Sequence, residues 1–318
     1  MSRTTIVMAA ALALAVTLPA VPAQAQSIRT FVSTAGSDSN PCSLVSPCRH
    51  FSAAVAATAV GGEVDALDPG AYGSFTISHA ITIEGQGWSY VAPPANGAAI
   101  TINAGASDDI EIRGVSLNGV GVANSTGILF NIGASLTIQD SIIRNVTDDG
   151  IHFVPTSSSS ISVSRSFVGR NGGFGILVQP QGSASATAVF ERVQTQYNGA
   201  NFYGIAIDAT ATTGSINATA TDSVSSNNGG GFIAEASASG TSLLLVRCTA
   251  SNNHTGVQAG NSPLGGLFGY VLMSQVAIMG NVVGWQTSGF AALVFTFGDN
   301  IIALNSSGNT APYSTAKQ

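Results

Sequence analysis

The sequence predicts an all-β protein that folds as a right-handed parallel β-helix, a solenoid of about eight coils with an N-terminal capping helix. Two observations lead to this fold class: a composition with very little charge, and two residue markers that recur together at the length of one coil. A repeating unit too small to bury its own apolar side must stack on copies of itself, and a solenoid is the result.

The composition is that of a folded β-protein. The 318 residues are 45% hydrophobic but only 8% charged, with 37 glycines. Disordered chains combine low hydrophobicity with high net charge, so this chain should fold. Conventional globular domains carry about 25% charged residues. The deficit indicates an extended β surface covered by Ser, Thr, Asn and Gln.

Residues 1–25 have the pattern of a secretory signal peptide. Arg3 supplies the positive end, residues 6–18 are an apolar run, and Ala23-Gln24-Ala25 fits the small-residue rule for cleavage. An uncleaved membrane anchor is the alternative, but the run is shorter than the ~20 residues that span a bilayer. We therefore expect an exported protein, periplasmic or secreted, whose mature chain begins at Gln26.

The mature chain is acidic. Cleavage removes Arg3, one of ten basic residues, and none of the 16 acidic ones, which leaves a net charge of −7. Nucleic-acid binding calls for a clustered basic stripe, and an anionic membrane surface attracts a polybasic patch. The sequence has neither, so we expect no nucleic-acid partner and no membrane association after signal removal.

Asparagine recurs after strand-like segments at intervals of 27, 26, 27, 30, 25, 28 and 28 residues. The positions are Asn118, Asn145, Asn171, Asn198, Asn228, Asn253, Asn281 and Asn309. Shortly after each of the first seven comes a glycine and an apolar residue, as in Gly150-Ile151 and Gly175-Ile176. Two markers that keep step over seven intervals indicate a structural repeat.

Each repeat contains two short segments in which apolar and polar residues alternate, for example residues 136–139 (LTIQ) and 151–154 (IHFV). Alternation with period two between turn residues is typical of β-strands. Stacked repeats would pair each strand in parallel with its copy one coil away.

The asparagine column has a physical explanation. Asparagine tolerates the left-handed conformation that a sharp turn needs. At the ~4.8 Å spacing of stacked strands its amides can also bond to one another as a ladder. The alternative is that asparagine serves only as a turn residue. The repeat is predicted in either case, because its period does not depend on bonds between the amides.

A capping region precedes the repeats, because a solenoid end exposes an apolar cross-section and unpaired strand edges. Residues 47–60 have helical spacing, with Phe51, Ala54, Val55 and Thr58 on one face, and Gly61-Gly62 as a terminator. The expected divisions are a signal peptide (1–25), the cap with entry strands (26–80), the repeats (81–310) and a tail (311–318).

The three cysteines divide into a close pair and a single residue. Cys42 and Cys48 should form a disulfide in an oxidising compartment; metal binding is the alternative, but no second pair accompanies them. Cys248 is left as a free thiol, a residue type that usually behaves as a small buried hydrophobe.

Five N-terminal segments carry a family likeness: residues 32–42 (VSTAGSDSNPC), 47–51 (PCRHF), 61–64 (GGEV), 67–73 (LDPGAYG) and 81–85 (ITIEG). They resemble the first module of exported bacterial right-handed parallel β-helix repeat proteins of the pectin-lyase-like superfamily. The resemblance extends over essentially the whole mature chain and implies fold and compartment. It does not imply one activity, since the superfamily includes pectate lyases, polygalacturonases, epimerases and adhesins.

The sequence contains only parts of known catalytic motifs. Asp148, Asp149 and His152 resemble part of a polygalacturonase-like site, but the Gly-His-Gly and Arg-x-Lys motifs that should accompany them are absent. Counting four residues past the repeat glycines places Asp208 and Glu235 one coil apart, roughly 5 Å at the Cα atoms. That separation suits a shared cation or a coupled acid pair.

If the protein has an active face, these five residues are its candidates; the alternative is a solvated strand face with scattered acids. Ca²⁺ is a possible cofactor only if the protein is a lyase; otherwise we expect no cofactor and no metal.

A second column stands six residues before the asparagines, with a one-residue slip in some coils. Its members are Arg113, Asp140, Arg165, Arg192, Asp222 and Arg247. Their mostly alternating charge predicts an ion ladder along the stack, in which each exposed pair contributes little. The alternative is an arginine track that grips a uronate or sulfated glycan, although Asp140 and Asp222 interrupt it.

The sequence therefore favours an exported, non-catalytic β-helix scaffold that binds glycans or other cell-surface material. The alternative is a polysaccharide lyase or glycoside hydrolase that acts on an acidic polysaccharide.

Overall fold

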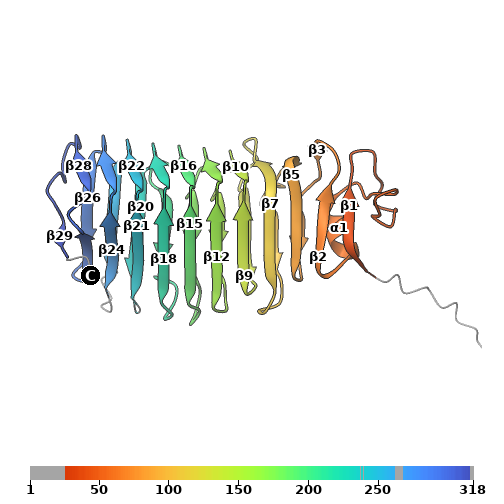
Figure 1. Ribbon diagram of the computed structural model, residues 1–318, viewed down its shortest axis with the longest axis horizontal. Helices are drawn as coiled ribbons and strands as arrows, with labels where there is room; N and C mark the ends of the chain where they lie inside the picture. Colours follow the sequence, from red (N-terminus) through yellow and green to blue (C-terminus); the bar gives the residue numbers. More distant parts are fainter. Residues whose placement is uncertain (1–25, 237, 239, 262–267, 316–318) are drawn as a thin grey trace, which may run out of the picture.

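The chain forms a parallel β-solenoid of about eight turns with one short helix near its N-terminus. The computed structural model describes residues 26–236, 238, 240–261 and 268–315, so the predicted signal peptide lies outside the described residues. Strands from successive coils lie side by side along the long axis (Figure 1). The predicted fold class is confirmed.

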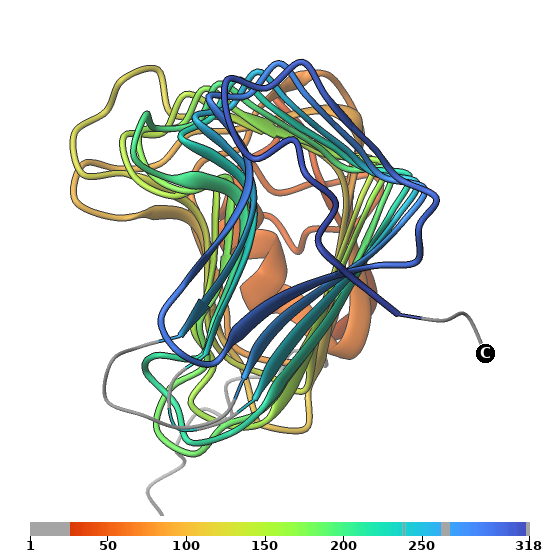
Figure 2. The same ribbon diagram turned by 90° about the vertical axis from the view of Figure 1, so that its left-hand side faces the viewer.

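A coil contributes strands to three faces, seen end-on in Figure 2. The first face consists of β1 (Ser27–Val32), β2 (Thr58–Ala66), β5 (Ile81–Val91), β7 (Asp109–Asn118), β9 (Ser135–Gln139), β12 (Ser159–Ser164), β15 (Ala186–Glu191), β18 (Ile216–Thr221), β21 (Thr241–Val246), β24 (Gly269–Ser274), β27 (Ala292–Thr296) and β29 (Tyr313–Ser314). The second face consists of the short strands β3 (Gly70–Ala71), β10 (Ile142–Arg144), β13 (Phe167–Gly169), β16 (Gln194–Gln196), β19 (Val224–Ser226), β22 (Thr249–Ser251), β25 (Ala277–Met279) and β28 (Ile301–Ala303). The C-terminal parts of the long strands β5 and β7 also belong to it, where they pair with β3 and β10.

The third face is a separate nine-stranded sheet. It consists of β4 (Phe75–Ile77), β6 (Ala98–Asn103), β8 (Thr126–Ile132), β11 (Ile151–Phe153), β14 (Ile176–Val178), β17 (Tyr203–Asp208), β20 (Gly230–Ala236), β23 (Thr255–Asn261) and β26 (Val283–Ser288).

The alternating pattern places apolar side chains inside the solenoid, because successive residues of a strand point to opposite sides. In one coil Ile161 and Val163 of β12, Val168 of β13, and Ile176 and Val178 of β14 are at most 1% exposed. Each strand pairs in parallel with its copy in the next coil, as β12 does with β15. The core therefore runs continuously along the axis.

The capping helix α1 (Phe51–Ala57) lies across the first coil and buries Phe51, Ala54 and Val55 (Figure 2). The predicted helical range of 47–60 is too long at both ends. Thr58 already belongs to β2, where it pairs with Ser27 of β1, so strand pairing overrides the helical spacing. The helix is not long and apolar enough to cross a membrane, and the described residues contain no other α-helix.

The cap is crosslinked as predicted: Cys42 and Cys48 form a disulfide. Both residues are buried and belong to the main core together with Val32 and Phe51. Cys248 is free and buried, and burial raises the pKa of its thiol to about 11.

A column of buried asparagines lines the corner between the second and third faces. The Nδ2 of each donates to Oδ1 of the next at 2.9–3.3 Å, and the members are Asn171, Asn198, Asn228, Asn253, Asn281 and Asn305. Asn309 lies four residues after Asn305 and accepts the last of these bonds at 2.9 Å. Asn305 was not in the predicted set.

Asn118 and Asn145 lie beside this column rather than in it. They bond to each other at 2.9 Å, but Arg144 pairs with Gly169, so the position equivalent to Asn171 is Val146. The left-handed residue of the corner is also not the ladder asparagine. It is the residue before it, such as Arg170 (φ 60°) or Tyr197 (φ 57°), and this turn directs the asparagine amide inward.

Candidate functional site

His152 and Asp149 lie together on the outer side of the third face. His152 belongs to β11 and points outward, and its Nδ1 lies 3.3 Å from Oδ2 of Asp149 in the preceding turn. The other carboxylate oxygen, Oδ1, accepts the backbone N–H of Phe174 from the next coil at 2.7 Å. Asp149 thus connects its own coil to the next one.

Burial sets the charge of this pair. Asp149 is only 5% exposed, and burial raises the pKa of its carboxyl to about 7, against the opposing effect of the Phe174 N–H. Burial also lowers the pKa of His152, although the nearby charge of Asp148 favours its protonation. Both shifts favour the neutral forms of the two side chains at neutral pH.

Asp208 and Glu235 form a second acidic position on the same face. They are register partners in β17 and β20, as predicted. Asp208 accepts a hydrogen bond from Nε2 of Gln179 at 2.6 Å. Burial, followed by the charge of Asp208, raises the pKa of Glu235.

The two acidic positions do not converge. His152 shares its column with Leu177, Ala206 and Ile233, so Asp208 is displaced by two coils and two residues from it. These three apolar residues form a small outer cluster covered by Phe174 and Tyr203. The five candidate residues, which include the exposed Asp148, therefore do not form one contiguous cluster, because apolar packing separates the two acidic positions.

The arginine column is made of separate pairs rather than one continuous ladder. Arg165 binds Asp140 through two bonds of 2.8 Å, and Arg247 binds Asp222 through bonds of 2.7 and 2.8 Å. Arg192, however, pairs with its neighbour Glu191 at 2.6 Å.

Arg113 pairs with Glu111 at 2.6 Å, because Gln139 rather than Asp140 is its register partner. Five members of the column, from Asp140 to Arg247, share a left-handed φ, so these residues also form the turn between the first and second faces. The sequence pattern did not indicate that role.

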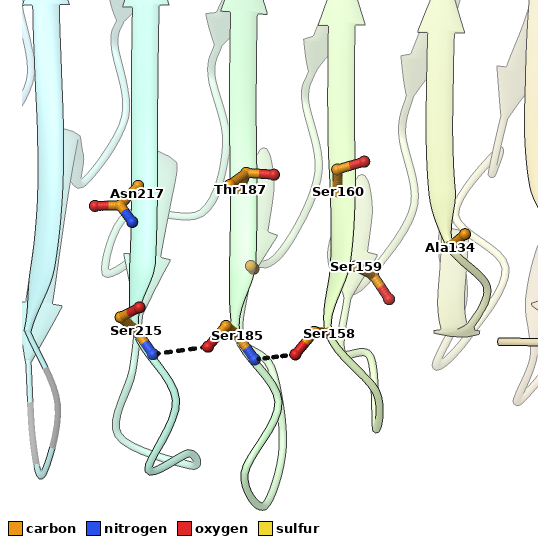
Figure 3. Close-up of a pocket in the computed structure, with 9 residues that line it drawn as sticks. Ala134, Ser158, Ser159, Ser160, Ser185, Thr187, Ser215 and Asn217 are labelled. Atoms are coloured by element: carbon orange, nitrogen blue, oxygen red, sulfur yellow. Dashed lines mark hydrogen bonds between the residues drawn. The ribbon is translucent and has the colours of Figure 1, made fainter. Parts of the chain in front are cut away.

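A depression of about 300 Å³ on the outer side of the first face was not anticipated from the sequence (Figure 3). Hydroxyl and amide side chains from three successive coils line it, among them Ser160, Thr187 and Asn217. The backbone N–H groups of Ser185 and Ser215 donate at 3.1 Å to the hydroxyls of Ser158 and Ser185 one coil away. The polar residues at every second position of these strands are the sequence feature that could have predicted this depression.

An aromatic ladder occupies the last coils of the same face. Phe268 and Tyr270 have ring centroids 5.3 Å apart, Tyr270 and Phe295 6.1 Å, and Phe295 and Tyr313 6.3 Å. Phe268 is 40% and Tyr313 59% exposed. These four residues, which we call the ring ladder, come from positions that look unrelated in the sequence.

Metal ligands are not grouped in the described part of the chain, where no three His, Cys, Asp or Glu side chains could hold an ion together.

Comparison with known proteins shows the fold. Pectate lyase Pel9A superimposes with a TM-score of 0.64 at 14% identity, over 91% of this chain and 78% of that chain. An alginate lyase from Paenibacillus sp. str. FPU-7 gives a TM-score of 0.48 at 12% identity, over 83% of this chain and 99% of that chain. No family model and no curated protein matches the sequence. The chain has the right-handed parallel β-helix fold of pectin-lyase-like proteins.

Proposed function

We propose that the protein is an exported, non-catalytic scaffold that binds a polysaccharide along the outer side of its first face. The observation that supports this proposal best is the depression lined by Ser160, Thr187 and Asn217 (Figure 3). These residues are register partners on β12, β15 and β18, so their polar groups repeat at the ~4.8 Å strand spacing. A row of hydroxyls and amides at regular spacing offers repeated hydrogen bonds to a chain of sugars.

Export is supported by the Cys42–Cys48 disulfide, since such bonds form and persist in oxidising compartments. The signal-like residues 1–25 agree with this part of the proposal.

Binding of purified residues 26–318 to a panel of neutral and acidic polysaccharides tests the proposal. Thr187 and Asn217 are exposed, so the double variant Thr187→Ala/Asn217→Ala should fold normally and lose affinity. Gln194→Ala, on the exposed side of the second face, is the matched control. Equal binding by both variants, or no binding by the wild type, would refute the proposal.

One observation favours the second candidate function, a polysaccharide lyase or glycoside hydrolase. Asp149 has a pKa near neutrality and contacts His152, an arrangement suited to general acid–base chemistry. Release of reducing or unsaturated ends from acidic polysaccharides, with and without Ca²⁺, would support it if Asp149→Asn abolished the release. The same assay with Asp208→Ala separates the two acidic positions.

A further inference from the structure

We propose that the first face takes an uncharged polysaccharide whose sugar rings have apolar faces, and that the ring ladder stacks against them. This inference rests on the proposed glycan binding and adds the chemical class of the glycan. Three observations support this inference: the position of the ring ladder, the distribution of charge and the register of the polar residues.

The ring ladder is on the outside of the solenoid and is not needed for the core. Tyr270 and Phe295 lie on the outward side of β24 and β27, where Val271 and Val294 fill the interior. Phe268 and Tyr313 extend the series at its two ends and are the most exposed of the four. Aromatic rings give large apolar contact areas, and an exposed apolar patch of this kind often marks a binding site.

The rings cross β24, β27 and β29 diagonally: the register partner of Tyr270 is Leu293, and Phe295 lies two residues further along β27, opposite Tyr313. Tyr270 and Phe295 are inclined by only 28° to each other, and Phe268 and Tyr270 by 25°. These two pairs are stacked, whereas Phe295 and Tyr313 are tilted by 54°. Together the four rings form an apolar platform against which the apolar faces of sugar rings can pack.

The hydroxyl-lined depression leads directly to this platform. Thr187 pairs with Asn217, Asn217 with Ser242, and Ser242 with Tyr270, so one column of the first face connects them. The hydroxyl of Ser242 also donates to Oδ1 of Asn217 at 2.8 Å. The column continues to Leu293, and Phe295 lies two residues beyond it on the same side of β27. A single glycan chain along this column would meet hydrogen-bonding groups first and then Tyr270, with Phe295 and Tyr313 beside it.

The charges on and beside this face argue against an acidic glycan. Strands β21, β24 and β27 contain no charged residue. The nearby arginines are already paired with carboxylates: Arg29 with Asp65, Arg113 with Glu111, Arg165 with Asp140, Arg192 with Glu191 and Arg247 with Asp222. A uronate or sulfate would have to displace these carboxylates, whereas an uncharged sugar would not.

The test compares cellohexaose with a galacturonate hexasaccharide by calorimetric titration into residues 26–318. We expect cellohexaose to bind and the galacturonate to bind at least about tenfold more weakly. Phe268→Ala/Tyr313→Ala should weaken cellohexaose binding roughly tenfold. Trp88→Ala removes an exposed aromatic residue from the N-terminal end of the solenoid and should leave the affinity unchanged.

A preference for the acidic hexasaccharide, or unchanged affinity in Phe268→Ala/Tyr313→Ala, would overturn the inference. If Thr187→Ala/Asn217→Ala abolishes binding and the ring variant does not, glycan binding stands and only the role of the ring ladder is refuted. If no saccharide binds the wild type, the proposed function itself fails. Sedimentation tests the alternative occupant of the ring ladder, a second copy of the chain. The inference would be refuted if the wild type formed a dimer, Phe268→Ala/Tyr313→Ala did not, and sugar binding were the same in both.

Discussion

Gly175 lies directly against the amide of Asn198. A Cβ at position 175 would be 2.8 Å from Nδ2 of Asn198 and 2.5 Å from the carbonyl oxygen of Gly204. Gly256 stands in the same relationship to Asn281, since a Cβ at position 256 would be 2.9 Å from Nδ2 of that residue. From Gly150 onward, the glycine and asparagine markers of the sequence keep step because each glycine makes room for the asparagine of the next coil.

We expect Gly175→Ala to destabilise the protein by about 1–3 kcal/mol, the usual cost of an added methyl group in a packed site. Its neighbours are a backbone oxygen and an already bonded amide, so neither can move away freely. Urea denaturation measures the change. The exposed substitution Gln194→Ala serves as control, and equal stability of the two variants would contradict the packing argument.

Asn171→Ala should lower stability by about 1–3 kcal/mol, because it leaves buried partners without hydrogen bonds. Oδ1 of Asn171 accepts the backbone N–H of Val146 at 3.2 Å, and its Nδ2 donates to Asn198 at 3.0 Å. The control is Asn131→Ala, which removes an exposed amide pair with Asn103. An unchanged melting temperature for Asn171→Ala would show that the ladder adds nothing at this coil.

Asp149 should make the stability depend on pH. Its folded-state pKa is raised from 3.8 to about 7, so between these values the folded state keeps a proton that the unfolded state has released. The resulting stabilisation is complete below about pH 4 and is lost as the pH rises through about 7.

His152 acts in the opposite direction, because burial lowers its pKa below 6.5. Its contribution is present above pH 6.5 and is lost on acidification through the folded-state pKa. Asn mimics the protonated carboxyl, so the stability of the wild type relative to Asp149→Asn should fall between pH 5 and pH 8. Chemical denaturation at the two pH values measures it, with the exposed Asp148→Asn as control; a difference that did not vary with pH would contradict the assignment.

Loss of the disulfide should destabilise the cap. Crosslinking Cys42 to Cys48, six residues apart, restricts the unfolded chain and is worth about 2 kcal/mol for so short a loop. Cys42→Ala/Cys48→Ala should melt at a lower temperature than the oxidised wild type. Dithiothreitol should lower the melting temperature of the wild type and not that of the variant. A wild type that was insensitive to reduction would refute a stabilising role.

The sequence by itself determined the solenoid. Alternation in segments such as residues 161–164 specifies strands with one buried side, and the recurrence of asparagine and glycine specifies stacking, because both depend only on spacing along the chain. The cysteine pair and the register of Asp208 with Glu235 were predictable for the same reason.

The tertiary structure alone decided what the coils bring together. Coils of unequal length shift the register, which moved Asn145 out of the ladder and brought Asn305 into it. The folding of the coils also brought together the rings of Tyr270, Phe295 and Tyr313, which are up to 43 positions apart in the sequence. Contacts between coils depend on the length of every intervening turn, and local sequence patterns do not fix those lengths relative to the axis.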